Sequence, residues 1–130
     1  MSIRITTGID LVEIDRVKRG CENPRFVDRV YSVAEQQLFC GERMSYESLA
    51  GNWAAKEAFS KALGTGVRDF SLTEVEVLRD ELGAPYLRLS GRAAKAAEGL
   101  SFSVSITHTG DLAEAICVAY NAQCTVHNAQ

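Results

Sequence analysis

The chain has 130 residues, of which 46% are hydrophobic and 24% are charged, and its formal net charge is −3. These values are typical of a single folded domain over residues 1–130 and exclude a disordered chain. The acidic balance argues against a protein that binds nucleic acid by neutralising phosphates. No apolar run approaches the ~20 residues of a membrane span, and the N-terminus lacks an apolar signal region. We therefore expect no membrane or nucleic-acid partner, and we expect a second copy of the chain to complete the pocket of any large ligand.

The sequence contains four cysteines, which are Cys21, Cys40, Cys117 and Cys124. None of them forms a CxxC pair, and no cluster of histidine and cysteine has the spacing of a zinc finger. A chain of this length does not need a disulfide framework. The pattern therefore predicts free thiols and a reducing, cytoplasmic location.

In chain order, the first predicted element is a strand over residues 3–11, where apolar side chains alternate on one face. Helical sequence follows over residues 12–31, with a break near residues 20–24. The capping-box pattern at Ser32–Glu35 opens a short helix that should stop near Gly41. The longest helix is predicted from Ser45 to Leu63, with Gly64 at the position of a C-terminal glycine.

The second half of the chain is dominated by predicted strands. Segments Thr73–Arg79 and Tyr86–Ser90 are joined by a turn with glycine and proline, which favours a hairpin. The remaining expected elements are a helix over residues 91–99, a strand around Phe102–Ile106, a loop at His108–Asp111, a strand over residues 113–120 and a polar tail from about residue 121. Because hairpins dominate, the sequence favours an α+β fold with an antiparallel sheet packed against one long helix.

The long helix carries the most informative charges. Lys56, Glu57 and Lys61 are embedded among small and apolar residues that occur on every face of this helix, which is typical of a buried helix. Glu57 and Lys61 are four residues apart and share one face, so they could form a solvated ion pair or part of a site. The glycines of Gly64–Gly66 could let backbone N–H groups approach a phosphate, or Gly64 could simply end the helix.

Two further residues have open interpretations. Asp10 interrupts the apolar first strand, and it could be a metal ligand or, together with Glu13, the N-cap of a helix. His108 follows a predicted strand and could be a surface residue or part of a site.

Three segments taken together resemble holo-acyl-carrier-protein synthase, the short, stand-alone type of 4'-phosphopantetheinyl transferase. They are Gly8–Ile14 with Arg16, Trp53–Gly66 and Ser103–Thr109. The resemblance runs in order from about residue 3 to residue 120. It implies a 4'-phosphopantetheinyl transferase-like fold and a homotrimer in which coenzyme A lies between subunits. It also implies transfer of phosphopantetheine from coenzyme A to a serine of apo acyl carrier protein, which releases adenosine 3',5'-bisphosphate and activates fatty-acid synthesis.

The resemblance also assigns roles to residues. The family's magnesium carboxylates fall on Asp10 and Glu57, and two carboxylates are enough for magnesium. Glu57 and Lys61 are the implied catalytic residues, with Glu57 or a metal-bound water as the base. The implied coenzyme-binding residues are Arg43, Lys61, Gly64, Gly66, Pro85 and His108. The implied carrier-protein-binding residues are Arg16 and Arg25.

Two positions depart from relatives. Several relatives have an arginine where this chain has Asn52, and larger relatives have an additional acid where this chain has Val12. The alternative function is a catalytically silent module of the same fold that binds carrier proteins. A different magnesium-dependent phosphoryl enzyme is less favoured because the sequence has no Walker-type GxxxxGK[ST] motif. Whether the carrier is a free protein or a domain of a multienzyme synthase stays open.

Overall fold

The structure is a computed structural model that describes residues 3–64 and 69–121. Its elements follow one another along the chain as β1 (Ile5–Glu13), α1 (Ile14–Gly20), α2 (Pro24–Val30), α3 (Val33–Phe39), α4 (Tyr46–Leu63), the 3₁₀ turn η1 (Leu72–Glu74), β2 (Val75–Arg79), β3 (Pro85–Leu89), α5 (Gly91–Ala96), β4 (Leu100–Thr109) and β5 (Leu112–Asn121). This mixture of helices and antiparallel strands confirms the α+β prediction. Within the described ranges, no helix has both the length and the apolar character needed to cross a membrane.

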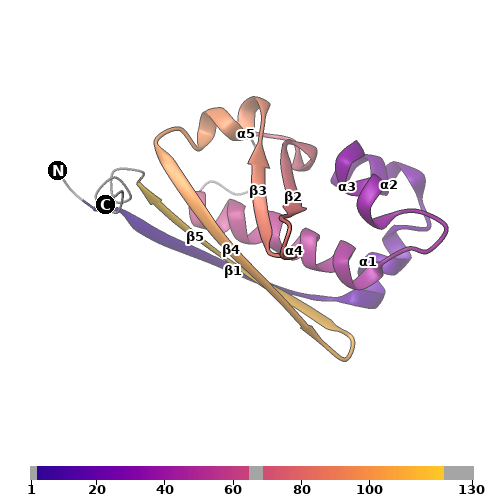
Figure 1. Cartoon of the computed structure of the whole chain (residues 1–130). Helices are drawn as coiled ribbons and strands as arrows, with labels where there is room; N and C mark the ends of the chain where they lie inside the picture. Colours follow the sequence, from indigo (N-terminus) through magenta and orange to yellow (C-terminus); the bar gives the residue numbers. More distant parts are fainter. Residues whose placement is uncertain (1–2, 65–68, 122–130) are drawn as a thin grey trace.

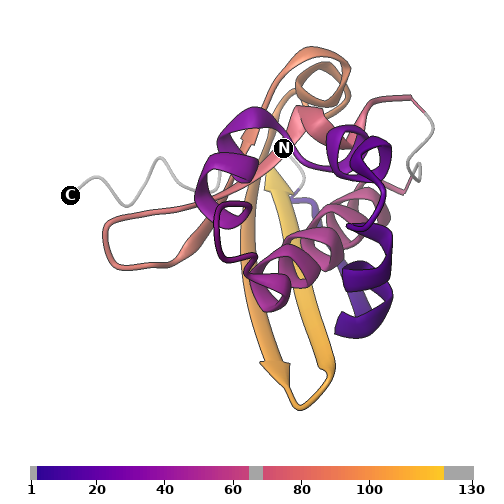
Figure 2. The same ribbon diagram turned by 90° about the vertical axis from the view of Figure 1, so that its right-hand side faces the viewer.

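The strands form two antiparallel sheets. The larger sheet has the order β1-β5-β4, and β2 and β3 pair as the expected hairpin. The long helix α4 lies along one face of the larger sheet (Figure 1). The turn of the β2–β3 hairpin projects from the body of the molecule (Figure 2).

Small side chains let α4 lie close to the sheet. The inner face of β5 carries Ala113, Ala115, Cys117 and Ala119, which are all buried. On β1 the contact is closer still, because a Cβ at Gly8 would collide with the backbone oxygen of Ala58. The hydroxyl of Thr6 donates a hydrogen bond of 2.7 Å to the backbone oxygen of Ala62. The inner face of β1 is therefore fixed directly against the last turns of α4.

The outer face of β1 and β5 carries exposed bulky apolar residues. The alternation expected in the first strand is present, but its apolar side chains point away from α4. Ile5, Ile9 and Leu11 have 63%, 54% and 58% of their surfaces exposed, and Ile116 of β5 has 39% exposed. A single chain thus leaves apolar surface on β1 and β5 uncovered.

The structure corrects two local predictions. Asp10 lies in the middle of β1 and is not a helix cap, because β1 pairs with β5 as far as Glu13 opposite Leu112. The helix expected from residue 12 consequently begins at Ile14. His108 belongs to β4, where it pairs with Ala113, so the turn between β4 and β5 is shorter than expected.

Several other predictions are confirmed. Ser32 and Glu35 form the capping box of α3, which ends at Phe39. Helix α4 spans 18 residues, and Gly64 follows it with a left-handed φ of 80°. The three cysteines within the described ranges, Cys21, Cys40 and Cys117, are free thiols. Thr65, Gly66, Cys124 and the polar tail after Asn121 lie outside the described residues.

The close contact at Gly8 predicts a large effect of a small substitution. Gly8→Ala should lower the free energy of unfolding by about 1–3 kcal/mol, because the added methyl group forces β1 away from α4. Urea denaturation measures this difference. The matched control is Gly41→Ala, since a Cβ at Gly41 meets no atom within 4 Å. Equal stability of the two variants would contradict the strand–helix contact described here.

Candidate active site

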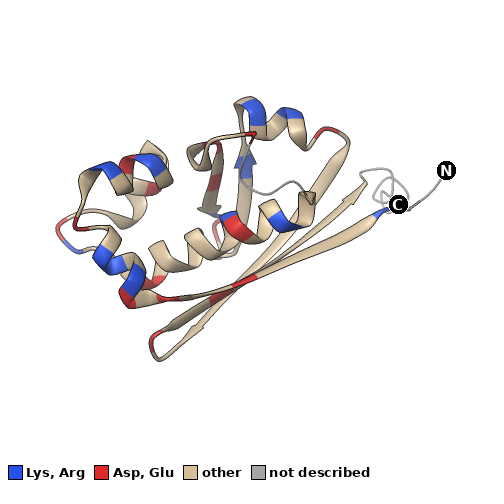
Figure 3. Cartoon of the chain, turned by 180° about the vertical axis from the view of Figure 1, so that it is seen from behind, with Lys and Arg blue, Asp and Glu red and all other residues tan. Residues whose placement is uncertain are grey.

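Three of the predicted site residues meet where β1 crosses α4. Asp10 is two residues beyond Gly8, so its side chain is on the same inner face of β1. Lys61 donates a hydrogen bond of 3.2 Å from Nζ to Oδ1 of Asp10 and one of 2.8 Å to the backbone oxygen of Ile9. In the coloured ribbon, basic and acidic positions lie next to one another on α4, and an acidic position lies on the strand that crosses it (Figure 3).

Glu57 is half-buried on the same side of α4. Burial raises the pKa of its carboxyl group, the negative charge of Asp10 raises it further, and the ammonium group of Lys61 lowers it. The two carboxylates are therefore near enough for their charges to repel each other. The hydrogen bonds of Lys61 go to β1, so the alternative of a simple Glu57–Lys61 pair on a solvated face does not describe this site.

The residues present fit a magnesium ion. Magnesium is bound by one or two carboxylates, with water and substrate phosphates as further ligands. Asp10 and Glu57 supply two such carboxylates. The Asp10 carboxylate already attracts one cation, because the ammonium group of Lys61 lies against it. Among the described residues no group of three or more His, Cys, Asp or Glu side chains could hold a metal. Val12 is buried in the core and offers no ligand.

The implied coenzyme-binding residues are divided between the two ends of α4. Lys61 and Gly64 lie at its C-terminal end. At its N-terminal end, Nδ1 of His108 is 3.9 Å from Oε2 of Glu47, and Arg43 lies just before the helix. Lys61 lies 14 positions after Glu47, which corresponds to about 21 Å along a helix. One copy of the chain therefore does not bring these residues together.

Pro85 and the carrier-binding candidates lie elsewhere on the molecule. Pro85 is the first residue of β3, on the projecting hairpin. Arg16 on α1 and Arg25 on α2 are exposed, and both helices carry more basic than acidic side chains (Figure 3). Arg16 also lines a cavity of about 240 Å³, whose other lining residues are Val12, Val17, Gly20, Phe26 and Trp53.

Asn52 belongs to a buried polar network and not to an exposed surface. Its amide donates to Oε2 of Glu35 and to the backbone oxygen of Val77, and its carbonyl accepts from Arg79. The same Glu35 pairs with Lys56, at 2.8 Å between Oε1 and Nζ, and both side chains are fully buried. The local sequence pattern predicts Glu35 as a capping residue, but no local pattern predicts this network.

The electrostatics of Glu57 can be tested without a substrate. The pKa of Glu57 is raised in the folded protein, so ionisation of this carboxyl group disfavours the fold. The protein should therefore keep the full contribution of protonated Glu57 to its stability below the ordinary pKa, and lose it as the pH rises through the raised value. In carboxyl-carbon NMR titrations, Asp10→Asn should lower the pKa of Glu57 and Lys61→Met should raise it. Unchanged titration curves in both variants would show that the three groups do not interact.

Comparison with known proteins identifies the family of this chain. The sequence matches the 4'-phosphopantetheinyl transferase superfamily over residues 6–117. It is 40% identical over 116 residues to a holo-[acyl-carrier-protein] synthase of Alkaliphilus oremlandii, with 86% of this chain and 95% of that protein covered. A second such synthase, from Clostridium botulinum, is 43% identical over 105 residues. The match covers 78% of this chain and 85% of that protein.

Solved structures show the same likeness. An ACPS–CoA complex from Chronobacterium ammoniagenes superposes with a TM-score of 0.79 at 32% identity, over 91% of this chain and 98% of that one. A holo-(acyl-carrier-protein) synthase from Bacillus anthracis in complex with CoA (3',5'-ADP) has a TM-score of 0.80 at 31% identity, over 93% and 100% of the two chains. The chain therefore belongs to the 4'-phosphopantetheinyl transferase superfamily.

Proposed function

We propose that this protein transfers 4'-phosphopantetheine from coenzyme A to a serine of apo acyl carrier protein and releases adenosine 3',5'-bisphosphate. The observation that carries the proposal is the meeting of Asp10, Glu57 and Lys61 where β1 crosses α4. The names of the relatives support the reaction, since they are holo-[acyl-carrier-protein] synthases and two solved relatives contain coenzyme A or its nucleotide.

The chemistry explains why these residue types are needed. Asp10 and Glu57 would hold a magnesium ion, which supplies positive charge against the pyrophosphate of coenzyme A when it is bound. Lys61 would bind the same phosphates and stabilise the leaving bisphosphate. The proton of the carrier serine would pass either to Glu57 or to a water held beside it. The raised pKa of Glu57 supports its candidacy as the proton acceptor.

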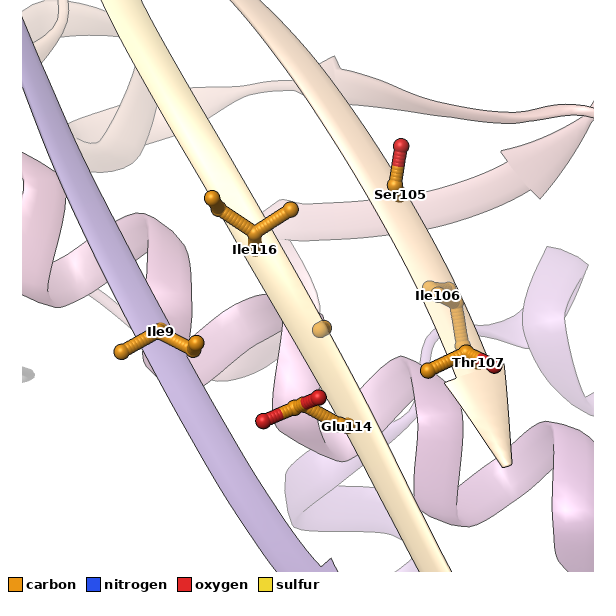
Figure 4. A pocket seen from close by; sticks show the side chains of 7 residues that line it. Ile9, Ser105, Ile106, Thr107, Glu114 and Ile116 are labelled. Atoms are coloured by element: carbon orange, nitrogen blue, oxygen red, sulfur yellow. The ribbon is translucent and has the colours of Figure 1, made fainter. Parts of the chain in front are cut away.

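The two-ended distribution of the coenzyme-binding residues supports an oligomer. We propose that Lys61 and Gly64 of one copy face His108, Pro85 and Arg43 of a neighbouring copy, most simply in a trimer. The outer face of the larger sheet offers the surface for this association. It includes a cavity of about 290 Å³ between Ile9, Ile116 and Glu114, with serine and threonine side chains of β4 along its other side (Figure 4).

The first two helices are the proposed docking surface for the carrier. Arg16 and Arg25 would attract an acidic carrier surface and fix its orientation. The cavity beside Arg16 is lined mainly by apolar side chains, including Phe26 and Trp53, and it could take an apolar side chain of the carrier. An apolar cavity with exposed basic residues around it is typical of a protein-binding surface.

The silent carrier-binding module is the less favoured function. It would retain the docking surface without any need for Asp10, Glu57 and Lys61, yet all three are present and adjacent. The role in fatty-acid biosynthesis, the cytoplasmic location and the single domain over residues 1–130 stay predictions from the sequence. Gly66 stays a predicted phosphate contact.

Incubation with coenzyme A, magnesium and an apo carrier tests the function directly. Intact-mass measurement should show addition of phosphopantetheine to the carrier. Asp10→Ala and Glu57→Ala should each reduce transfer by several orders of magnitude while the protein stays folded, because each removes a ligand of the charge-neutralising metal. Near-normal turnover with a normal metal requirement in either variant would remove that residue from the metal site.

The shared site can be tested by mixing inactive subunits. Glu57→Ala and His108→Ala chains should each be poorly active alone and regain activity when they are unfolded and refolded together. With random assembly of a cyclic trimer, about a quarter of the sites should be intact. Sedimentation should show a trimer. A fully active monomer at the assay concentration, or mixed assemblies without any gain in activity, would contradict the shared site.

The carrier surface predicts a selective kinetic effect. Arg16→Glu or Arg25→Glu should raise KM for the carrier about fivefold or more, because an attraction becomes a repulsion. The effect should shrink as salt rises, since screening weakens both terms. KM for coenzyme A should hardly move. A rise in KM for coenzyme A alone would place this surface at the nucleotide.

A further inference from the structure

Lys61 lies against the residue that the proposed function assigns to the metal. Its ammonium group contacts Oδ1 of Asp10 at 3.2 Å and the backbone oxygen of Ile9 at 2.8 Å. The Asp10 side chain is only 17% exposed, whereas the Lys61 side chain is 54% exposed. The carboxylate is therefore mostly covered by protein, whereas more than half of its cationic partner is open to solvent.

The backbone explains why both contacts are available to one lysine. β1 is an edge strand of the sheet β1-β5-β4, so some of its carbonyl groups have no partner strand. Ile9 presents such an oxygen beside Asp10, and Lys61 bonds to both. Carbonyl and carboxylate oxygens are also the ligand types that magnesium prefers. Lys61 therefore occupies an oxygen-lined position that suits a small cation.

We propose that Lys61 is a displaceable internal cation, which neutralises Asp10 in the metal-free protein and competes with the metal for it. The inference rests on the proposed function, because it takes Asp10 as a metal ligand. Metal entry requires Lys61 to leave Asp10, and the phosphates of coenzyme A offer it another anionic partner. Metal alone should therefore bind weakly. Lys61 should contact β1 when no metal is bound, and it should contact the phosphates of coenzyme A when metal and coenzyme are both bound.

Removal of the competing charge should strengthen the binding of metal alone. We would measure Mn²⁺ binding without coenzyme A by the electron paramagnetic resonance signal of free Mn²⁺. Lys61→Met should bind Mn²⁺ about three- to tenfold more tightly than the unchanged protein. The matched control is Lys95→Met on α5, which removes the same charge from an exposed position outside the site and should change the affinity less than twofold. Asp10→Asn should abolish the tighter binding.

A second measurement detects the displacement itself. The side-chain ammonium signal of Lys61 in a ¹H–¹⁵N spectrum, assigned by its absence in Lys61→Met, should shift when Mg²⁺ is added to the protein without coenzyme A. The same signal should be altered in Asp10→Asn before any metal is added. These readouts do not depend on catalysis.

The outcomes separate this inference from the proposed function. Equal or weaker Mn²⁺ binding by Lys61→Met, or an ammonium signal that does not move at saturating Mg²⁺, would overturn the displacement of Lys61. Either result would leave the proposed transfer reaction standing if the mass assay shows modified carrier. Mn²⁺ binding that is indifferent to Asp10→Asn would overturn the inference together with the magnesium site.

Discussion

The close contact between β1 and α4 at Gly8 is the constraint on which the site depends. No side chain separates the strand from the helix there, and the backbone of Ala58 fills the space a Cβ would take. Asp10 follows on the same face of β1, while Glu57 and Lys61 each precede one of the two alanines that contact Gly8, Ala58 and Ala62. A residue larger than glycine would separate the carboxylate of the strand from the charges of the helix.

A buried ion pair between Lys56 and Glu35 fixes the side of α4 that faces away from β1. Lys56, the residue before Glu57, donates to Glu35 and to the backbone oxygens of Leu72 and Val75. Burial lowers the pKa of Lys56, and Glu35 opposes this shift. A buried ion pair seldom adds stability over apolar packing, but it requires specific partners. It therefore holds α3, η1 and β2 in one arrangement around the helix that carries the site.

Local patterns predicted the elements well where the decisive interactions are local. The capping box at Ser32 and the end of α4 at Gly64 are examples, since both are settled within a few residues. Asp10 was ambiguous because its spacing to Glu13 suits a cap, and only pairing with β5, about a hundred residues later, keeps the segment extended. Glu35 shows the same limit, since its second carboxylate oxygen accepts from Asn52 and from the distant backbone of Val77. The predicted meeting of Asp10 with Glu57 came from the family resemblance and not from the local pattern.

The outer face of the sheet follows from the same constraint. Strands alternate their side chains between two faces, so β1 and β5, which turn Gly8 and three alanines toward α4, carry Ile5, Ile9, Leu11 and Ile116 on the other face. Ile5, Ile9 and Leu11 are more than half exposed in one chain, and covering them would release ordered water at a gain of about 25 cal/mol for each Å² of apolar surface. Close packing inside the chain thus leaves apolar surface outside it, and burial of this surface would favour the association proposed above. The proposed shared site requires the two ends of α4 to come from different copies, because they lie about 21 Å apart along the helix of a single chain.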